Sequence, residues 1–94
     1  MPTIPLKCNG DSGNFHVPKK PDTVTFKTAG KCTLTTFGFV PKDNPPGFQR
    51  GAANPDGSIP YSYDGSPIPS TGYAFAYVTS DQVVLGNGTG VIKN

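Results

Sequence analysis

The stretch "TVTFKTAGKCTLTTFGFV", residues 23–40, decides the fold class. At its start, Val24 and Phe26 alternate with threonines, which is the period-2 pattern of a strand that buries one face. A short loop, Ala-Gly-Lys at 29–31, separates this strand from a second one at 32–40. Because a glycine in a short loop readily adopts the positive φ that tight turns need, the stretch predicts a β-hairpin.

The second strand of this stretch changes its apolar phase, from Cys32 and Leu34 to Phe37 and Phe39. A strand with one buried face cannot do this unless it contains a β-bulge or is buried on both sides. Gly38 lies beside the change, and a glycine inside a strand often marks such a bulge. We therefore expect an irregular strand here.

The composition of the whole chain predicts an all-β fold. Its 94 residues include no Glu, three Leu and one Arg, but ten Thr, seven Val, six Phe and four Tyr. Strong helix formers are thus scarce, and residues that fit a pleated sheet are abundant. The 12 Gly and 11 Pro indicate many turns, and the formal net charge of only +2 differs from that of a disordered chain.

Turn residues divide the chain into seven or eight short strands. The candidates are 3–8, 14–18, 23–28, 32–40, 59–63, 73–79, 82–86 and 90–93, with further hairpins at "VTSDQVV" (78–84) and "LGNGTGV" (85–91). This rhythm is typical of a small antiparallel β-sandwich, with a small β-barrel as the alternative. The segment "VPKKPDTVTFKTAGKCTLTTF" (17–37) resembles the early strands of immunoglobulin-like and cupredoxin-like sandwiches in its strand spacing.

We expect one domain, 1–94, with a long irregular loop at about 41–58. The segment 41–60 holds five prolines and three glycines, which are incompatible with regular structure. Long loops in compact domains are often functional, so an unusual role is expected here first.

Two cysteines leave two alternatives open. Cys8 and Cys32 suit one disulfide, which would add roughly 3 kcal/mol by the loop-entropy model. Two reduced, buried cysteines fit the sequence equally well, because the sequence does not give the Cα separation that a bridge requires.

The chain lacks the ligands of common metal sites. A blue-copper site needs two His and one Cys, but His16 is the only histidine. A structural zinc site needs four ligands, and Cys8, Cys32 and His16 make three. We expect no metal and no cofactor.

Catalytic sets are equally incomplete. His16 could act as the base for a serine, but no G-x-S-x-G context is present. Every carboxylate is an Asp, and those in "NPDGS" (54–58) and "YDGS" (63–66) are predicted in turns, where the side chain binds its own backbone. A non-enzymatic protein is therefore expected, and a small hydrolase that uses His16 is the remote alternative.

The tyrosines offer a candidate binding surface. Tyr61 and Tyr63 are two residues apart, and Tyr73 and Tyr77 are four apart, so each pair lines one face of its strand. Such rings usually pack in a core, and the alternative is a platform for a sugar ring or a partner protein. The residues of this surface are Phe48, Arg50, Tyr61, Tyr63, Asp64, Tyr73 and Tyr77.

The leading hypothesis is a non-enzymatic structural or interaction module that acts through loops and strand edges, as a subunit or decoration component of a larger assembly. The terminal segments "TIPL" (3–6) and "GVIKN" (90–94) are apolar enough to pair with a neighbour's edge strand. The expected partner is another protein or a second copy, and a carbohydrate is the alternative.

Other partners and locations follow from charge and hydropathy. The lysines are spread along the chain, so no nucleic-acid partner is expected, and no apolar run is long enough to span a membrane. The first residues lack the pattern of a secretory signal. This fits either an intracellular or virion-associated protein or a mature secreted domain with an added Met.

Overall fold

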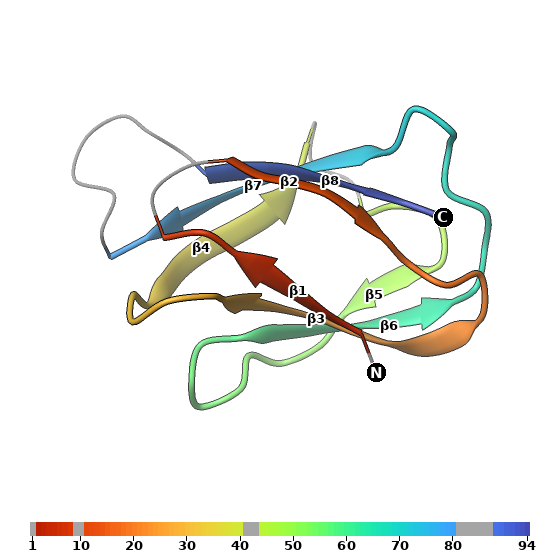
Figure 1. Ribbon diagram of the computed structural model, residues 1–94. Coiled ribbons are helices and arrows are strands. Elements are labelled where there is room, and N and C mark those ends of the chain that lie inside the picture. Colours follow the sequence, from red (N-terminus) through yellow and green to blue (C-terminus); the bar gives the residue numbers. More distant parts are fainter. Residues whose placement is uncertain (1, 9–10, 41–43, 81–87) are drawn as a thin grey trace.

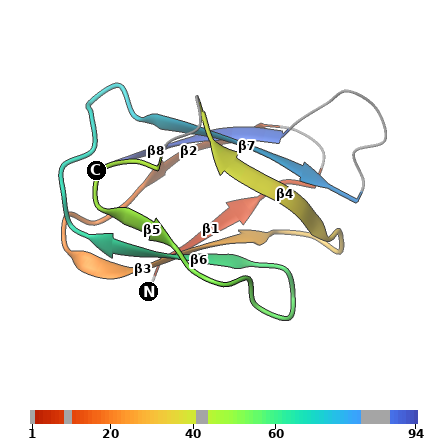
Figure 2. The same cartoon turned by 180° about the vertical axis from the view of Figure 1, so that it is seen from behind.

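The computed structural model describes residues 2–8, 11–40, 44–80 and 88–94. Within these ranges the protein is all-β without a helix, and eight strands form two four-stranded sheets (Figure 1). The strands are β1 (Thr3–Leu6), β2 (Asp11–His16), β3 (Pro21–Thr28), β4 (Leu34–Phe39), β5 (Phe48–Arg50), β6 (Ile59–Asp64), β7 (Tyr73–Thr79) and β8 (Gly88–Lys93). The sheets form two packed layers that do not close into a barrel in this part of the chain, as Figure 2 shows from behind. The predicted sandwich is confirmed, and the barrel alternative is wrong.

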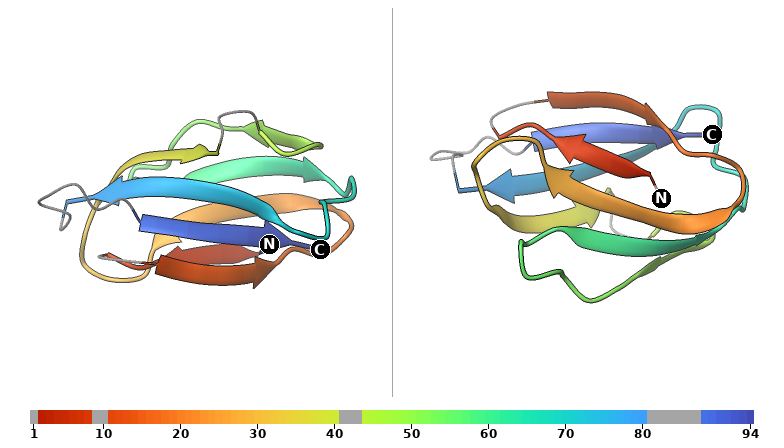
Figure 3. Two further views of the ribbon diagram at one scale, coloured as in Figure 1. Left: turned by 90° about the horizontal axis from the view of Figure 1, so that it is seen from above. Right: turned by 60° about the horizontal axis from the view of Figure 1, so that its bottom comes forward.

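The two sheets are mixed rather than purely antiparallel. Sheet A has the order β1-β3-β6-β5, and sheet B has the order β2-β8-β7-β4 (Figure 3). The pairs β1–β3 and β2–β8 are parallel, and the other four are antiparallel. Since β2 lies in the other sheet, the chain reverses twice between β1 and β3, and these two strands therefore run in the same direction.

The hairpin predicted between residues 23–28 and 32–40 is wrong. β3 pairs with β1 and β6 in sheet A, whereas β4 pairs with β7 in sheet B. The connection between them crosses from one layer to the other. This crossing places the apolar faces of both strands opposite each other, with the ring centroids of Phe26 and Phe37 4.5 Å apart.

The predicted bulge in β4 is confirmed, although it lies earlier than Gly38. Leu34 faces Thr79 and Thr36 faces Val78, so the residue between Leu34 and Thr36 is extra. The shift turns the two phenylalanines that follow toward the core. Gly38 itself points outward.

Three residues of the segment predicted to be an irregular loop form a strand. β5 pairs with β6, and a turn precedes it, in which Gly47 has a φ of +82° and the Phe48 N–H donates to the Pro45 carbonyl (3.1 Å). A strand of three residues is too short for a period-2 pattern to be recognised in the sequence, so this strand was not predicted. The predicted strand at 82–86 and the turns of the two predicted hairpins lie largely outside the described residues.

The core between the sheets is an aromatic cluster. Phe26 is fully buried, and its ring centroid lies 4.5–5.8 Å from those of Phe37, Phe39, Tyr61 and Phe75. Most of these contacts are edge-to-face, the geometry that the aromatic quadrupole favours. The rings come from β3, β4, β6 and β7, so they join both sheets.

Two glycines of β8 make room for this cluster. Gly88 lies opposite Tyr77 and Gly90 opposite Phe75 on the neighbouring strand. A Cβ atom added at either glycine would lie 2.2 Å from the ring of its partner. The spacing of Gly88 and Gly90 therefore serves packing, because the rings lie across the bare backbone.

Cys8 and Cys32 lie at disulfide-bonding distance, with their Cα atoms 5.8 Å apart. The bridge joins the turn after β1 to the segment that leads into β4. Threonine hydroxyls donate to both cysteine carbonyls, from Thr79 to Cys8 (2.5 Å) and from Thr28 to Cys32 (3.0 Å). Of the two alternatives, the structure favours the disulfide.

Candidate functional site

The aromatic residues predicted to form a binding surface lie in the core. Tyr61, Tyr63 and Tyr77 are 1%, 3% and 1% exposed, and Phe48 is 4% exposed. Tyr73 is half-buried and packs against the same cluster. These rings therefore pack in the core, the usual arrangement, and do not form an exposed platform, because the packing of the two sheets turns their shared face inward.

The tyrosine hydroxyls are bonded to neighbouring segments. The Tyr77 hydroxyl donates to the Lys7 carbonyl (2.8 Å) and is 2.5 Å from the Ser12 hydroxyl. The Tyr63 hydroxyl donates to the Ser66 carbonyl and accepts from Asn94 Nδ2 (3.0 Å). Buried phenols need such partners, so these groups hold the fold together.

Arg50 bridges the two sheets. Its Nη1 donates to the Phe37 carbonyl (2.8 Å), so the guanidinium of β5 reaches β4 in the other layer. Burial raises the pKa of the nearby Tyr61 phenol, and the positive charge of Arg50 opposes this shift. The predicted site residue Arg50 thus has a structural partner.

His16 lies exposed on β2. Its Nδ1 is 3.3 Å from the Asn94 carbonyl oxygen, and Lys93 is its cross-strand neighbour. In the described ranges no three His, Cys, Asp or Glu side chains gather where they could hold a metal ion. Cys8 and Cys32 are bonded to each other, so neither is free to act as a ligand.

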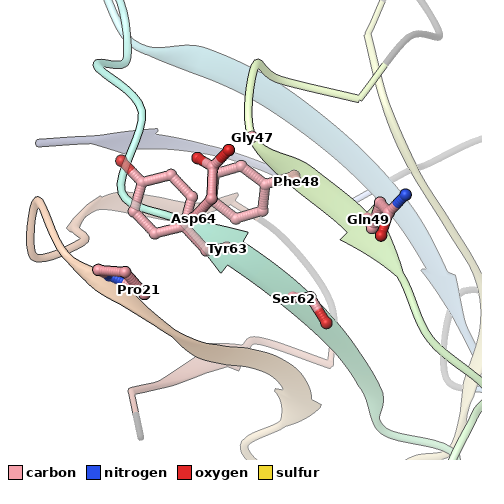
Figure 4. Close-up of a pocket in the computed structure, with 7 residues that line it drawn as sticks. All are labelled: Pro21, Gly47, Phe48, Gln49, Ser62, Tyr63 and Asp64. Atoms are coloured by element: carbon pink, nitrogen blue, oxygen red, sulfur yellow. The ribbon is translucent and has the colours of Figure 1, made fainter.

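A shallow groove of about 610 Å³ lies over the ends of β5 and β6 (Figure 4). Its lining is Pro21, Gly47, Phe48, Gln49, Ser62, Tyr63 and Asp64. The groove thus brings together Phe48, Tyr63 and Asp64 of the predicted surface, and it leaves out the other four. The Phe48 and Tyr63 rings stack with centroids 4.4 Å apart, and both are buried.

The carboxylate of this groove is engaged in a turn. Asp64 Oδ1 accepts from the backbone N–H (2.8 Å) and the hydroxyl (2.6 Å) of Ser66, and these bonds lower the pKa of Asp64. Asp56 and Ser58 form the same pair of bonds at the other end of β6. The predicted role of these aspartates in turns is confirmed. The groove offers hydrogen-bonding groups but no nucleophile paired with a base.

The outer faces of the two sheets differ sharply in chemistry. Sheet A presents polar and charged side chains with prolines: Thr3, Pro5, Thr23, Thr25, Lys27, Gln49, Pro60, Ser62 and Asp64. On β4, β7 and β8, sheet B presents mostly small, uncharged residues, which we call the sheet B face: Thr36, Gly38, Ala74, Ala76, Val78, Thr89 and Val91. Asn14 and His16 of β2 and Lys93 at the end of β8 border it on the same side of the sheet. Outer faces of sandwiches are normally polar, so the part of sheet B formed by β4, β7 and β8 is the exception.

The sheet B face is continuous across three strands. Ala76 of β7 lies between Gly38 of β4 and Thr89 of β8, and Ala74 lies beside Val91. Val40 extends this surface at its rim: it is 49% exposed, and its N–H donates to the Ala74 carbonyl (3.0 Å). The signal was present in "YAFAYV" (73–78), where aromatic residues alternate with Ala and Val instead of with polar residues.

The strand edges are less available than the sequence indicated. β1 carries Pro5, which has no N–H to donate to an added strand. "GVIKN" forms most of β8, which lies between β2 and β7. The prediction that this segment pairs with a neighbouring molecule is therefore wrong. "TIPL" is β1, whose Ile4 and Leu6 side chains are buried in the core.

Among the described residues there is no helix that could cross a membrane. Comparisons with known proteins find no family model that matches the chain, and no curated protein matches it either.

Proposed function

We propose that this protein is a non-enzymatic interaction module that binds a protein partner through the sheet B face, as a component of an assembly. The observation that carries the proposal is the contrast between the two outer faces. Sheet A is covered by hydroxyl, amide and charged groups, whereas the sheet B face is formed by Ala, Val, Gly and Thr. Contiguous apolar surfaces of this kind are typical of protein interfaces.

The shape of the surface supports a protein partner rather than a small ligand. The residues at its centre are Ala76 and Gly38, so two backbones could approach closely there, and the groove of about 480 Å³ beside them, over Ala74, Thr89 and Val91, is shallow and open. Small ligands are usually bound in concave pockets that bury most of their area. A flat apolar sheet instead matches another flat surface, as in sheet-on-sheet packing.

Photo-crosslinking tests this function. A photoreactive phenylalanine analogue is placed at position 76 on the sheet B face, and in a matched variant at position 25, where Thr25 is central on sheet A. In an extract of the native host, position 76 is expected to give one or a few discrete protein adducts. Position 25 is expected to give none. Equal patterns from both positions, or no adduct from position 76, would contradict the proposal.

A further inference from the structure

We infer that the partner of the sheet B face is a second copy of this chain, packed face to face about a two-fold axis near Ala76. This inference rests on the proposed function and names its partner. Three properties of the face support it: its charge, its area and the position of its smallest side chains.

Charge favours pairing of sheet B with sheet B. None of the seven residues of the face is charged, so two copies bring no like charges together at the centre. A head-to-tail contact of sheet B with sheet A would instead cover Lys27 and Asp64 with apolar side chains. Burial of charged groups against apolar surface is costly, so the symmetric contact is preferred.

Among the described residues, two cations flank the sheet B face: Arg50, whose guanidinium donates to the Phe37 carbonyl beside Gly38, and Lys93 near the end of β8. Lys93 is four residues from Thr89 on β8, and Thr89 lies beside Ala76. At about 3.3 Å per residue, Lys93 is roughly 13 Å from an axis at Ala76. The two-fold operation places the second Lys93 on the opposite side, beyond the screening length of about 8 Å at physiological salt.

The available area is sufficient for a weak dimer. The molecule measures 36 × 28 × 19 Å, and the sheets are its broad sides. If half of the broad side of each copy is covered, about 1,000 Å² is buried in total, near the lower limit for specific interfaces. We therefore expect a dissociation constant of roughly 10 μM or weaker.

The smallest side chains lie where the sheets must approach most closely. Gly38 and Ala76 are cross-strand partners near the middle of the face, with Ala74 and Thr89 around them. Facing sheets usually lie about 10 Å apart, and side chains of this size allow a closer approach. An alanine-rich centre with valines around it is therefore self-complementary under a two-fold axis.

Sedimentation equilibrium of the purified protein from about 1 μM to 1 mM tests the inference. The wild type is expected to shift from monomer to dimer in this range. Ala74→Lys, which covers a charged side chain with the apolar face of the other copy, is expected to raise the dissociation constant at least tenfold. Thr25→Lys, the matched change on sheet A, is expected to leave it unchanged. Thr89→Lys replaces Ala74→Lys if circular dichroism shows that the latter does not fold.

A wild type that stays monomeric at 1 mM overturns the inference, and so does a dimer that both lysine variants on sheet B leave intact. Neither result decides the proposed function, because the photo-crosslinking experiment reports on it separately. An adduct at position 76 with twice the chain mass of 9.8 kDa supports self-association. An adduct with a different protein refutes self-association but retains the interaction module.

Discussion

Replacement of Gly90 by alanine tests how the core is built. Gly90 lies opposite Phe75, and an added Cβ would be 2.2 Å from the tip of that ring and 2.8 Å from its next carbon. Ordinary contacts begin near 3.4 Å, so the ring must retreat by more than 1 Å. Phe75 is fully buried and contacts four other rings, which leaves no open space for it.

The expected cost can be estimated from two opposing effects. Overpacking of a core typically costs about 1–3 kcal/mol, and the central position of Phe75 favours the upper part of this range. Alanine recovers about 0.4–1 kcal/mol because it restricts the unfolded chain more than glycine does. We therefore expect Gly90→Ala to lower the free energy of unfolding by about 2 kcal/mol.

Gly38→Ala is the matched control, because Gly38 is in the same sheet but faces outward. An added Cβ there meets no atom within 4 Å, and its φ is not positive. The control is expected to gain about 0.4–1 kcal/mol. With an m-value of about 1 kcal/mol/M, the two variants should differ by about 2–3 M in the urea midpoint. Tyrosine fluorescence at low micromolar protein follows unfolding without a contribution from dimers.

A second substitution tests whether the contact with the Phe75 ring causes the loss of stability in Gly90→Ala. Phe75→Leu removes the far end of the ring, so it should cost less in the Gly90→Ala background than in the wild type. If Gly90→Ala matches Gly38→Ala within 0.5 kcal/mol, or if the two changes at positions 75 and 90 are additive, the reasoning about this ring is refuted.

Three further predictions concern other parts of the molecule. Replacing both Cys8 and Cys32 by serine should cost about 3 kcal/mol by the loop-entropy model and lower the Tm by about 15 °C in calorimetry, and an unchanged Tm would count against the bridge. Asn94→Ala removes hydrogen bonds to Ile68 N–H (2.5 Å), the Val17 carbonyl (3.1 Å) and a tyrosine hydroxyl (3.0 Å). The free energy of unfolding, measured by urea titration, should fall by about 2 kcal/mol. A fall below 0.5 kcal/mol would show that water replaces these bonds. The pKa of Asp64 is lowered below 3.8 in the folded state, so the ionised carboxylate stabilises the fold above that pH, and this effect is lost as the pH falls through the folded pKa. The difference in Tm between wild type and Asp64→Asn should therefore close from pH 5 to pH 2. A constant difference would contradict this.

The sequence predicts which faces are buried better than which strands are neighbours. The alternation around Val24 and Phe26 correctly places both side chains in the core. The same pattern is compatible with a hairpin and with a crossing between sheets, because both bury the same face. The short loop after Thr28 favoured the hairpin, but the aromatic contacts across the layers determine the crossing.

The candidate site was predictable only in part. The spacing of Tyr61 and Tyr63 shows that their rings share a face, but it does not show whether that face is inside or outside. The sheet B face was missed because Ala74 and Ala76 are also acceptable on a buried strand. Their exposure depends on the order of strands in space, which one sequence without relatives does not provide.

The disulfide determines the route of a mechanical force through this protein. The covalent loop between Cys8 and Cys32 contains the whole of β2 and β3. Tension applied at the two ends of the chain passes through the sulfur–sulfur bond and bypasses both strands. In the reduced protein the same tension loads β2 against its parallel neighbour β8 in shear, with their hydrogen bonds strained together. In an assembly under load, the redox state would thus set which strands resist extension.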